Sequence, residues 1–283
     1  MPNKLYLECY SGISGDMTVA ALLDLGADQQ VLLEGLESLN LPGYQLKIGR
    51  VKKNGIDACD FDVILDDPEH DHEHHHDHVH EHHHDHDHEH HHDHDHDHDH
   101  DHDHEHHHHH DHVHRNIGDI FAIIDQSKIS DRAKQTAKDI FRIIAAAESK
   151  AHGIAEDQVH FHEVGAVDSI VDIVSAAICL DNLDITEAVV SDLYEGCGYV
   201  HCQHGLMPVP VPAVVNIAAD NALRLRLTQT RGEMITPTGA AIAAYLSKGG
   251  KLPESFVIEK IGLGAGKKDF ATANILRAFL IRD

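Results

Sequence analysis

The sequence predicts a mixed α+β or α/β fold in two lobes, interrupted by a disordered insertion that is rich in histidine and acidic residues. Three observations support this prediction. Residues 1–66 alternate strand patterns with helix patterns, residues 67–114 have almost no apolar side chains, and residues 115–283 combine amphipathic helices with short strands. We therefore expect an N-terminal α/β lobe, a metal-binding insertion, and a second α+β lobe that packs against the first.

The first lobe begins with a strand, a glycine-rich turn and a helix. Residues 4–10 alternate apolar and polar side chains, and Gly26 follows the apolar-periodic helix that begins at Asp16. Asn54 and Gly55, between two alternating runs, are a strong hairpin signal. The expected elements are a strand at 4–10, helices at 16–26 and 28–39, and a hairpin with strands at 44–53 and 56–65.

The second lobe has mostly helical patterns. Ser130 precedes an alanine-rich stretch with one apolar face, Asp168 is expected to cap a strongly apolar helix, and Pro212 stands where proline favours the first helical position. The expected elements are helices at 117–126 and 130–152, an extended segment at 159–163, a helix at 169–183, strands and loops at 187–211, a helix from residue 212, a helix at 238–247, and closing strands at 256–262 and 273–282.

The insertion is a candidate metal-collecting segment. Residues 70–114 hold 28 of the 33 histidines and 15 acidic residues, with two valines as their only apolar side chains, so they cannot offset the entropy cost of ordering. Imidazole and carboxylate groups bind divalent transition metals, most strongly nickel and copper. A flexible segment cannot impose one geometry, so we expect it to collect metal while the chemistry occurs elsewhere; solvated filler is the alternative. The expected ligands include His94, His96, His98, His100, His102 and His104.

The composition narrows the class of protein and its partners. The formal net charge is −26, and the folded remainder is acidic even without the insertion, which disfavours a nucleic-acid partner. The five cysteines are odd in number and form no CxxC motif, which indicates reduced thiols. The first residues read as a strand instead of a signal peptide, and no apolar run approaches the ~18 residues of a membrane span. We expect a cytoplasmic protein without membrane contact.

The stretch VHFHEVGAVDS, at residues 159–169, is the best candidate for a folded site. On an extended segment His160 and His162 point to the same side, and Glu163 follows where the chain turns. The next helix places Asp168 and Asp172 on one face among Ile, Val and Ala, where a buried carboxylate needs a partner such as a metal, a histidine or a cation. The structural alternative is a helix cap at Asp168 with a hydrogen-bonded His–Asp pair.

Three further motifs contain small or ligating residues. The first is SGISGD between a strand and a helix start, where backbone amides can bind phosphate; the alternative is a capped turn. Its candidate residues are Ser11, Gly12, Ser14, Gly15 and Asp16. GLGAGKK, at residues 262–268, fails as a P-loop in its glycine spacing and its final lysine. In HCQHG, Cys202 is expected to be structural, while His204 stays a candidate metal ligand.

Taken together, the segments CYSGISGDM, HRNIGDI, VHFHEVGAVDSIVDIV, HGLMPVPVPA, GEMITPTGAA and GLGAGKKD resemble the LarC family in order and spacing. That family inserts nickel into pyridinium-3,5-bisthiocarboxylic acid mononucleotide and so makes the nickel-pincer nucleotide cofactor of lactate racemase. Its members also carry a His-rich insertion at this place. Glu8 stands where the family usually has aspartate.

The resemblance implies a CTP-dependent cyclometallase, a lyase of the metal-chelatase type. It implies nickel, and CTP with Mg or Mn bound through a C-terminal part that would begin where this chain stops. We expect SGISGD to bind the substrate phosphate, and His160, His162 and Glu163 to receive nickel. Glu163, Asp168 or a histidine is expected to act as base, and Asp172 to orient a histidine. The expected partners are the organic substrate, the CTP-binding part and further copies of the chain. The alternative function is a non-enzymatic nickel store or metallochaperone.

Overall fold

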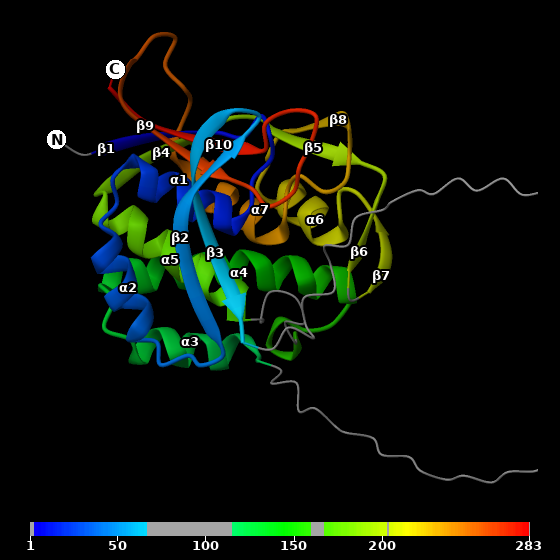
Figure 1. The fold of residues 1–283 in the computed structure, drawn as a ribbon. Coiled ribbons are helices and arrows are strands. Elements are labelled where there is room, and N and C mark those ends of the chain that lie inside the picture. The colour runs from blue at the N-terminus through cyan, green and yellow to red at the C-terminus, as the bar shows by residue number, and fades with distance from the viewer. Residues whose placement is uncertain (1–2, 67–114, 160–166, 203, 283) are drawn as a thin grey trace, which may run out of the picture.

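The computed structural model describes residues 3–66, 115–159, 167–202 and 204–282, which form ten strands and seven α-helices (Figure 1). The strands are β1 (Asn3–Glu8), β2 (Tyr44–Lys53), β3 (Ile56–Leu65), β4 (Ile185–Val190), β5 (Leu193–Cys197), β6 (Tyr199–Cys202), β7 (Gly205–Pro208), β8 (Leu225–Arg231), β9 (Val257–Ala265) and β10 (Ile275–Arg282). The helices are α1 (Gly15–Leu25), α2 (Gln29–Glu37), α3 (Ile117–Gln126), α4 (Asp131–His152), α5 (Val167–Asn182), α6 (Pro212–Asp220) and α7 (Pro237–Leu246), with short 3-10 turns η2 (Glu156–Gln158) and η3 (Ser247–Gly249).

Six strands form one mixed sheet in the order β2-β3-β9-β10-β1-β4. β1 lies antiparallel to β10 and parallel to β4, and β9 joins the β2–β3 hairpin through a single parallel pair, Cys59 with Gly264. Two smaller pairs, β5–β8 and β6–β7, stand outside this sheet. The C-terminal strands thus lie between strands of the N-terminal region, so the sheet is complete only when both ends of the chain are present.

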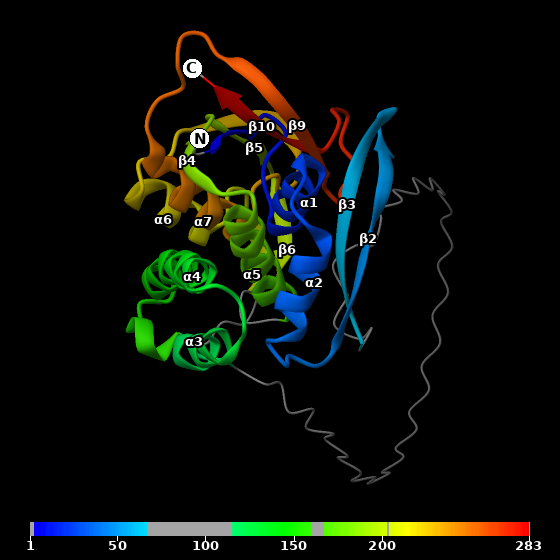
Figure 2. The same cartoon turned by 90° about the vertical axis from the view of Figure 1, so that its left-hand side faces the viewer.

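The helices stack in layers on one face of the sheet (Figure 2). α1 packs on β9, β3 and β10, while α5 and α7 lie beside it. α4 packs on α5, α6 and α7, and α3 packs on α4. Their apolar faces form one core that includes residues from both sides of the 67–114 segment, among them Leu5, Phe61, Phe141 and Leu276. The division into lobes at 1–66 and 115–283 stays a prediction.

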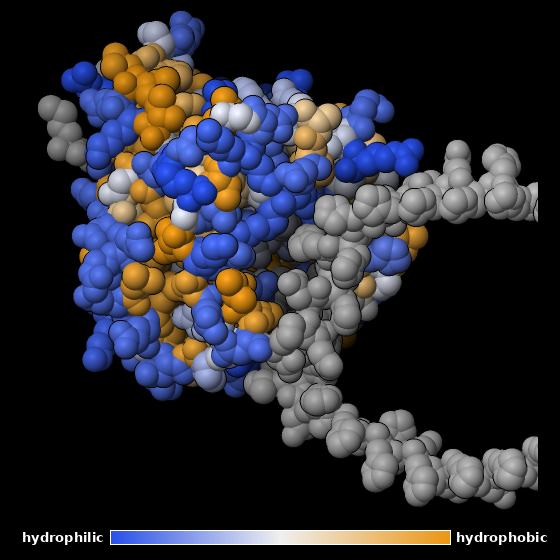
Figure 3. Space-filling model, viewed as in Figure 1, coloured by the Kyte–Doolittle hydropathy of each residue, from blue (hydrophilic) through white to orange (hydrophobic). Residues whose placement is uncertain are grey.

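The opposite face of the sheet has a smaller apolar cluster. Tyr6, Val189, Phe279 and Ile281 are buried there, and Phe256 packs against them. Apolar side chains also reach the surface where β9 begins, at Val257, Ile258 and Ile261 (Figure 3). Figure 3 shows smaller apolar patches between polar residues over the rest of this view.

Glycines allow α1 to lie unusually close to β9. A Cβ atom at Gly264 would stand 2.0 Å from the carbonyl oxygen of Met17, and one at Gly262 would stand 2.1 Å from that of Ala21. The run GLGAGKK does not have the P-loop pattern, and its glycines at positions 262 and 264 instead allow close helix–strand packing. It brings the start of α1 against the end of β9.

Most of the predicted elements are confirmed. The helix at 117–126 and the hairpin strands at 44–53 and 56–65 match their predicted bounds, and Asn54 and Gly55 both have positive φ, at 49° and 83°. Ser130 caps α4, and Pro212 is the first residue of α6. In the described part of the chain, no helix is long and apolar enough to cross a membrane.

Three details of the prediction are wrong. Asp168 does not cap α5, because the helix already begins at Val167 and includes Asp168 in its first turn. β8 was not expected, since five of its seven residues are polar and resemble an exposed loop as much as an edge strand. β9 continues to Ala265, through glycines that sequence propensity assigns to a loop. The extended segment predicted at 159–163 lies outside the described residues from position 160 onward.

Candidate functional site

The segment between β1 and α1 is fixed by the chain around residues 234–236. The amide of Ile13 donates to the Met234 carbonyl at 2.9 Å, and the amide of Thr236 donates to the Ile13 carbonyl at 3.1 Å. Gly12 has φ +87°, and a Cβ there would stand 2.0 Å from the Met234 oxygen. The SGISGD segment is therefore held in one conformation by backbone contacts on both sides, and it begins α1 at a fixed place.

Two carboxylates meet at the start of α1. Asp16 lies in the first turn, where its Oδ1 accepts a hydrogen bond from the Met17 amide at 2.8 Å and a second from the Ser14 hydroxyl. Asp172 projects from α5 against Gly15: a Cβ on Gly15 would stand 2.4 Å from Asp172 Oδ2. Only glycine at position 15 leaves room for this carboxylate. We call Asp16, Asp168 and Asp172 the carboxylate centre.

The carboxylate centre holds negative charge in a poorly hydrated place. Burial raises the pKa of Asp172 well above its ordinary value, and the charges of Asp16 and Asp168 raise it further. Burial also raises the pKa of Asp16, against the opposing hydrogen bonds from Ser14 and Met17. Asp172 Oδ1 is buried and has no hydrogen-bond partner among the described residues. The centre therefore favours a bound proton or a bound cation.

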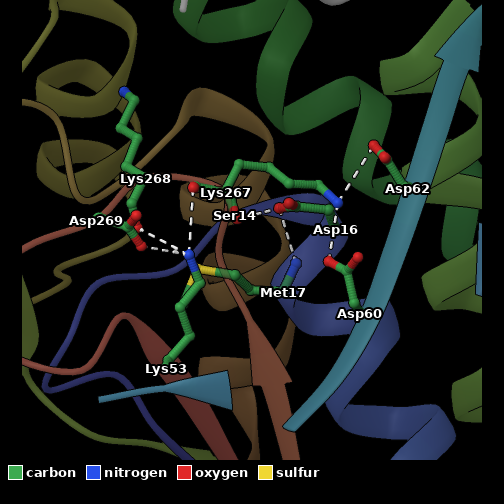
Figure 4. Close-up of polar contacts among 9 residues, drawn as sticks. All are labelled: Ser14, Asp16, Met17, Lys53, Asp60, Asp62, Lys267, Lys268 and Asp269. Carbon is green, nitrogen blue, oxygen red and sulfur yellow. Dashed lines mark hydrogen bonds and ion pairs between the residues drawn. The ribbon is translucent and has the colours of Figure 1, made fainter. Parts of the chain in front are cut away.

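Lys267, two residues after β9, lies beside Asp16 with its Nζ between two acids of β3 (Figure 4). Its Nζ is 2.9 Å from Asp60 Oδ1 and 3.2 Å from Asp62 Oδ1. Burial lowers the pKa of Lys267, but hydrogen bonding and charge from Asp60 outweigh it, and the net shift is upward. Its positive charge acts on both Asp16 and Asp172, whose pKa values it lowers.

Two further ion pairs involve residues near Lys267 along the chain, and Figure 4 shows the one between Lys53 and Asp269. Lys268 Nζ is 3.3 Å from Glu233 Oε2, and Lys53 Nζ is 2.6 Å from Asp269 Oδ1. The segment after β9 therefore brings two consecutive lysines, each with an acidic partner, to the edge of the site.

Glu195 of β5 lies beneath the 233–236 segment and is completely buried. Its Oε1 accepts backbone hydrogen bonds from Gly196 at 2.7 Å, Met234 at 2.8 Å and Ile235 at 3.2 Å, while its Oε2 has no partner among the described residues. Burial raises the pKa of Glu195 to about 7. Because Met234 and Ile235 hold Ile13, Glu195 positions the segment that leads to Asp16.

His204 lies in a different part of the molecule, in the turn between β6 and β7. Its ring faces that of His152, the last residue of α4, with 4.8 Å between the ring centroids. Its Nδ1 is 4.0 Å from Cys202 Sγ. Among the described residues, no group of three or more His, Cys, Asp or Glu side chains has the arrangement of an assembled metal site.

The structure brings some of the predicted site residues together. Asp16, Asp168 and Asp172 form one centre beside Ser14 and Gly15, although they come from two separate motifs. His160, His162, Glu163 and the histidines from His94 to His104 lie outside the described residues. The amides of Gly12 and Ile13 already donate to backbone carbonyls, so phosphate binding by SGISGD depends on the other donors of that segment. The roles given to all these residues stay predictions.

Sequence reasoning missed several residues of the site. Lys267 was noted only as part of a failed P-loop, and no local signal links it to Asp60 and Asp62, which are 207 and 205 positions away along the chain. Glu195, in the unremarkable stretch YEGCG, gave no signal either. The apolar residues around Asp172 in the α5 sequence did identify it as a buried carboxylate that needs a partner.

Comparison with known proteins gives a family match over nearly the whole chain. The family model described as nickel insertion protein matches residues 5–283. A protein of Alkaliphilus metalliredigens, named pyridinium-3,5-bisthiocarboxylic acid mononucleotide nickel insertion protein, is 60% identical over 286 residues, with 100% of this chain and 61% of that protein covered.

Proteins with the same name from two other bacteria are more distant. The one from Clostridium acetobutylicum is 46% identical, covering 98% of this chain and 63% of its own length. The one from Acetivibrio thermocellus is 39% identical, covering 98% and 60%. The chain thus spans about 60% of the length of the curated relatives it matches. No solved structure matches it.

Proposed function

Because this chain belongs to the nickel insertion protein family, we propose that its folded part inserts nickel into pyridinium-3,5-bisthiocarboxylic acid mononucleotide, the molecule named for its relatives. The product is the nickel-pincer nucleotide cofactor of lactate racemase, and the activity is that of a lyase of the metal-chelatase type. The chain spans about 60% of the length of those relatives, and we assign CTP with Mg or Mn to a part outside residues 1–283.

The carboxylate centre is the observation that carries this proposal. Asp16 and Asp172 have raised pKa values because they are buried close together, and Asp172 Oδ1 lacks a partner among the described residues. A divalent cation between such groups displaces their protons and satisfies the orphaned oxygen, so binding and ionisation are coupled. Asp16, Asp168 and Asp172 do not by themselves form an assembled metal site in the described part of the chain, so nickel, as the ion to be transferred, would be held there loosely by carboxylate oxygens. It would then pass to the sulfur ligands of the substrate, which suit it better.

The same centre supplies a base for the insertion step. Forming the nickel–carbon bond requires that the ring carbon lose its proton: the C–H electron pair passes to nickel, and the proton passes to a carboxylate. A carboxylate with a raised pKa in a poorly hydrated site is suited to accept it. We assign this role to Asp172 or Asp168, with Glu163 as the third candidate.

The organic substrate also carries a phosphate, which we assign to the start of α1. Ser11, Gly12, Ser14 and Gly15 supply the loop, and the N-terminal end of a helix favours an anion. Lys267 adds a positive charge beside Asp16. The charge of Lys267 offsets the repulsion that the carboxylates would otherwise exert on the phosphate.

We assign nickel supply to the histidines that precede the centre. The segment from His94 to His104 would collect the ion, and His160 and His162 would pass it toward Asp168 and Asp172. Replacing His160 and His162 together with alanine should abolish cofactor formation and leave the fold intact. Unchanged activity in that double variant would remove both histidines from the pathway.

The proposal is tested by following cofactor formation directly. The chain is supplied with the C-terminal part of a full-length relative, CTP, Mg, nickel and the organic substrate, and the nickel-bearing product is detected by mass spectrometry. We expect product with the wild type and with Asp57→Asn, a matched control at an exposed carboxylate that pairs with Arg50. We expect none with Asp172→Asn.

The same assay separates insertion from storage. A nickel store or metallochaperone would bind and release the ion without changing the organic molecule, so it would give no product with any variant. Equal product from the wild type and Asp172→Asn would place the chemistry outside the carboxylate centre.

A further inference from the structure

Two histidines from distant parts of the chain face each other at the end of α4. His152 is the last residue of that helix, and His204 lies in the turn between β6 and β7. Their ring centroids are 4.8 Å apart, with 42° between the ring planes. Both residues are exposed to solvent. The β6–β7 hairpin, whose strands pair with Cys202 opposite Gly205, places the turn over the helix end.

Each of these imidazoles has a second group at one of its ring nitrogens. Glu148 Oε2, one helical turn earlier, is 3.4 Å from His152 Nε2. Cys202 Sγ is 4.0 Å from His204 Nδ1. Histidines that bind metals use one ring nitrogen for the metal and commonly donate the other N–H to a carboxylate. Glu148 stands in that position toward His152, which leaves Nδ1 of His152 as the nitrogen that would bind the ion.

The spacing of the two rings suits a shared ion. An imidazole nitrogen lies about 2.0–2.1 Å from a bound first-row metal, which puts each ring centroid about 3.2 Å from the ion. Two such rings at about 90–110° around the ion then have centroids roughly 4.5–5.2 Å apart. The observed 4.8 Å falls within this interval.

The surrounding charge also favours a cation. The carbonyl end of a helix carries partial negative charge, and His152 ends α4. Glu148 adds a carboxylate, while the positive charge of nearby Lys150 is paired with Asp220 at 2.5 Å. A divalent ion would therefore meet an electronegative surface at this point.

We propose that His152 and His204 form a two-histidine binding site for a divalent first-row metal ion, with water completing the coordination. Glu148 orients His152, and the site is open to solvent on the surface of the protein. An exposed pair of imidazoles exchanges its ion readily, which suits uptake and transfer more than permanent storage. The choice of nickel as the ion rests on the proposed function, but the site itself rests on the geometry.

The site can be tested on the full chain with the 67–114 segment in place. The free nickel concentration is set with nitrilotriacetate as a metal buffer, so that binding by other histidines does not deplete it. The rate at which diethyl pyrocarbonate modifies each histidine is then measured by peptide mass spectrometry. We expect nickel to protect His152 and His204 at one common free concentration, while the exposed His201 on β6 keeps its rate.

Variants test whether the two histidines act as a pair. His152→Ala should raise the nickel concentration that protects His204 by about tenfold or more, His204→Ala should do the same for His152, and Glu148→Gln should have a smaller effect in the same direction. His201→Ala is the matched control and should change neither concentration. Both histidines lie at exposed positions, so circular dichroism should report an intact fold.

Independent behaviour of the two residues would overturn the proposal. In one such outcome, nickel protects His204 in His152→Ala at the same concentration as in the wild type. In the other, nickel protects neither residue at any concentration. Either result would mean that the contact between the rings is purely structural. This measurement does not depend on cofactor formation. Paired protection without any cofactor product would therefore support the metal site and contradict the proposed function.

Discussion

Asp172 is the residue at which stability and function oppose each other most clearly. Its carboxylate is pressed against Gly15 beside Asp16, and one of its oxygens has no hydrogen-bond partner among the described residues. Burial raises its pKa, so the ionised form destabilises the folded protein. Natural proteins retain such groups where activity depends on them.

Asp172→Asn should therefore make the protein more stable and less active. Removing the buried charge at nearly constant volume should raise the free energy of unfolding by about 1–3 kcal/mol at pH 8. Asp57→Asn, at an exposed ion pair, should change it by less than about 0.5 kcal/mol. Chemical denaturation measures the free energy of unfolding of both variants. A loss of stability in Asp172→Asn would contradict the prediction, because it would mean that the ionised carboxylate stabilises the folded protein.

Glu195 should make stability depend on pH. Its pKa is raised from 4.5 to about 7 by burial, so the folded state binds more protons than the unfolded state between these values. This contribution to stability is fully present below pH 4.5 and is lost as the pH rises through 7.

Comparison with Glu195→Gln isolates that effect. Between pH 5 and pH 8 the stability of the variant relative to wild type should rise by about 1–3 kcal/mol, because only the wild type acquires a buried charge. Glu187→Gln, at an exposed position that pairs with Lys4, should show no such trend. Denaturation across this pH range gives the measurement, and parallel curves for wild type and Glu195→Gln would contradict the assignment.

The sequence identified individual site residues only where a residue differs sharply from its neighbours along the chain. An aspartate within the apolar run SIVDIVSAAI identifies Asp172 as a costly group without any structure. Glu195 and Lys267 lie in ordinary surroundings along the chain, and their environment comes from segments far away in sequence. His152 gave no signal, because its partner His204 is 52 positions distant.

Among the elements, the contact between α1 and β9 depends most on side-chain size. Gly264 and Gly262 let the backbone of the strand approach the backbone of the helix directly. This contact sets the position of the start of α1, and with it the position of Asp16. Packing at this interface therefore has a direct consequence for the carboxylate centre.

Gly264→Ala should separate α1 from β9. A Cβ there would stand 2.0 Å from the Met17 carbonyl oxygen, so one of the two elements must move, which should lower the free energy of unfolding by about 1–3 kcal/mol. Gly49→Ala on β2 is the matched control, because a Cβ at Gly49 has no neighbour within 4 Å. Thermal or chemical unfolding compares the stability of the two variants. Equal stability of Gly264→Ala and Gly49→Ala would contradict the prediction and mean that α1 can shift away from β9 at no cost.

Local signals predicted the elements well where a turn or a cap fixes them. Asn54-Gly55, Gly26 at the end of α1 and Pro212 at the first position of α6 each favour a conformation that few other residues adopt. β8 and the last three residues of β9 escaped prediction for different reasons. β8 has only two apolar residues, Leu225 and Leu227, and the end of β9 includes a glycine, so neither stretch has the sustained alternating pattern of a half-buried strand.

For the whole molecule, the order of the strands could not be predicted from the chain. β9 and β10 enter the sheet between β3 and β1, which places residues 257–282 among strands formed by residues 3–65. The pairing of such distant segments depends on the shape of the assembled core. The mixed fold class is confirmed, since it follows from the types of elements alone.

The same topology predicts that the histidine-rich segment is dispensable for folding. The sheet and the core described here are built entirely from residues outside 67–114. Deleting residues 70–114 should leave the unfolding transition of the protein nearly unchanged, as measured by circular dichroism and thermal denaturation. A large loss of cooperativity would mean that the segment takes part in the core.

The most direct test of the account is cofactor formation by the chain that lacks residues 70–114. The assay contains CTP, the organic substrate and the C-terminal part of a relative, and nickel is varied from scarce to saturating. If the folded part carries the chemistry, product should form at saturating nickel and fail at scarce nickel, and Asp172→Asn in the same background should abolish it throughout. A deletion variant that is folded but inactive at every nickel concentration would contradict the account and place nickel insertion on the histidine-rich segment.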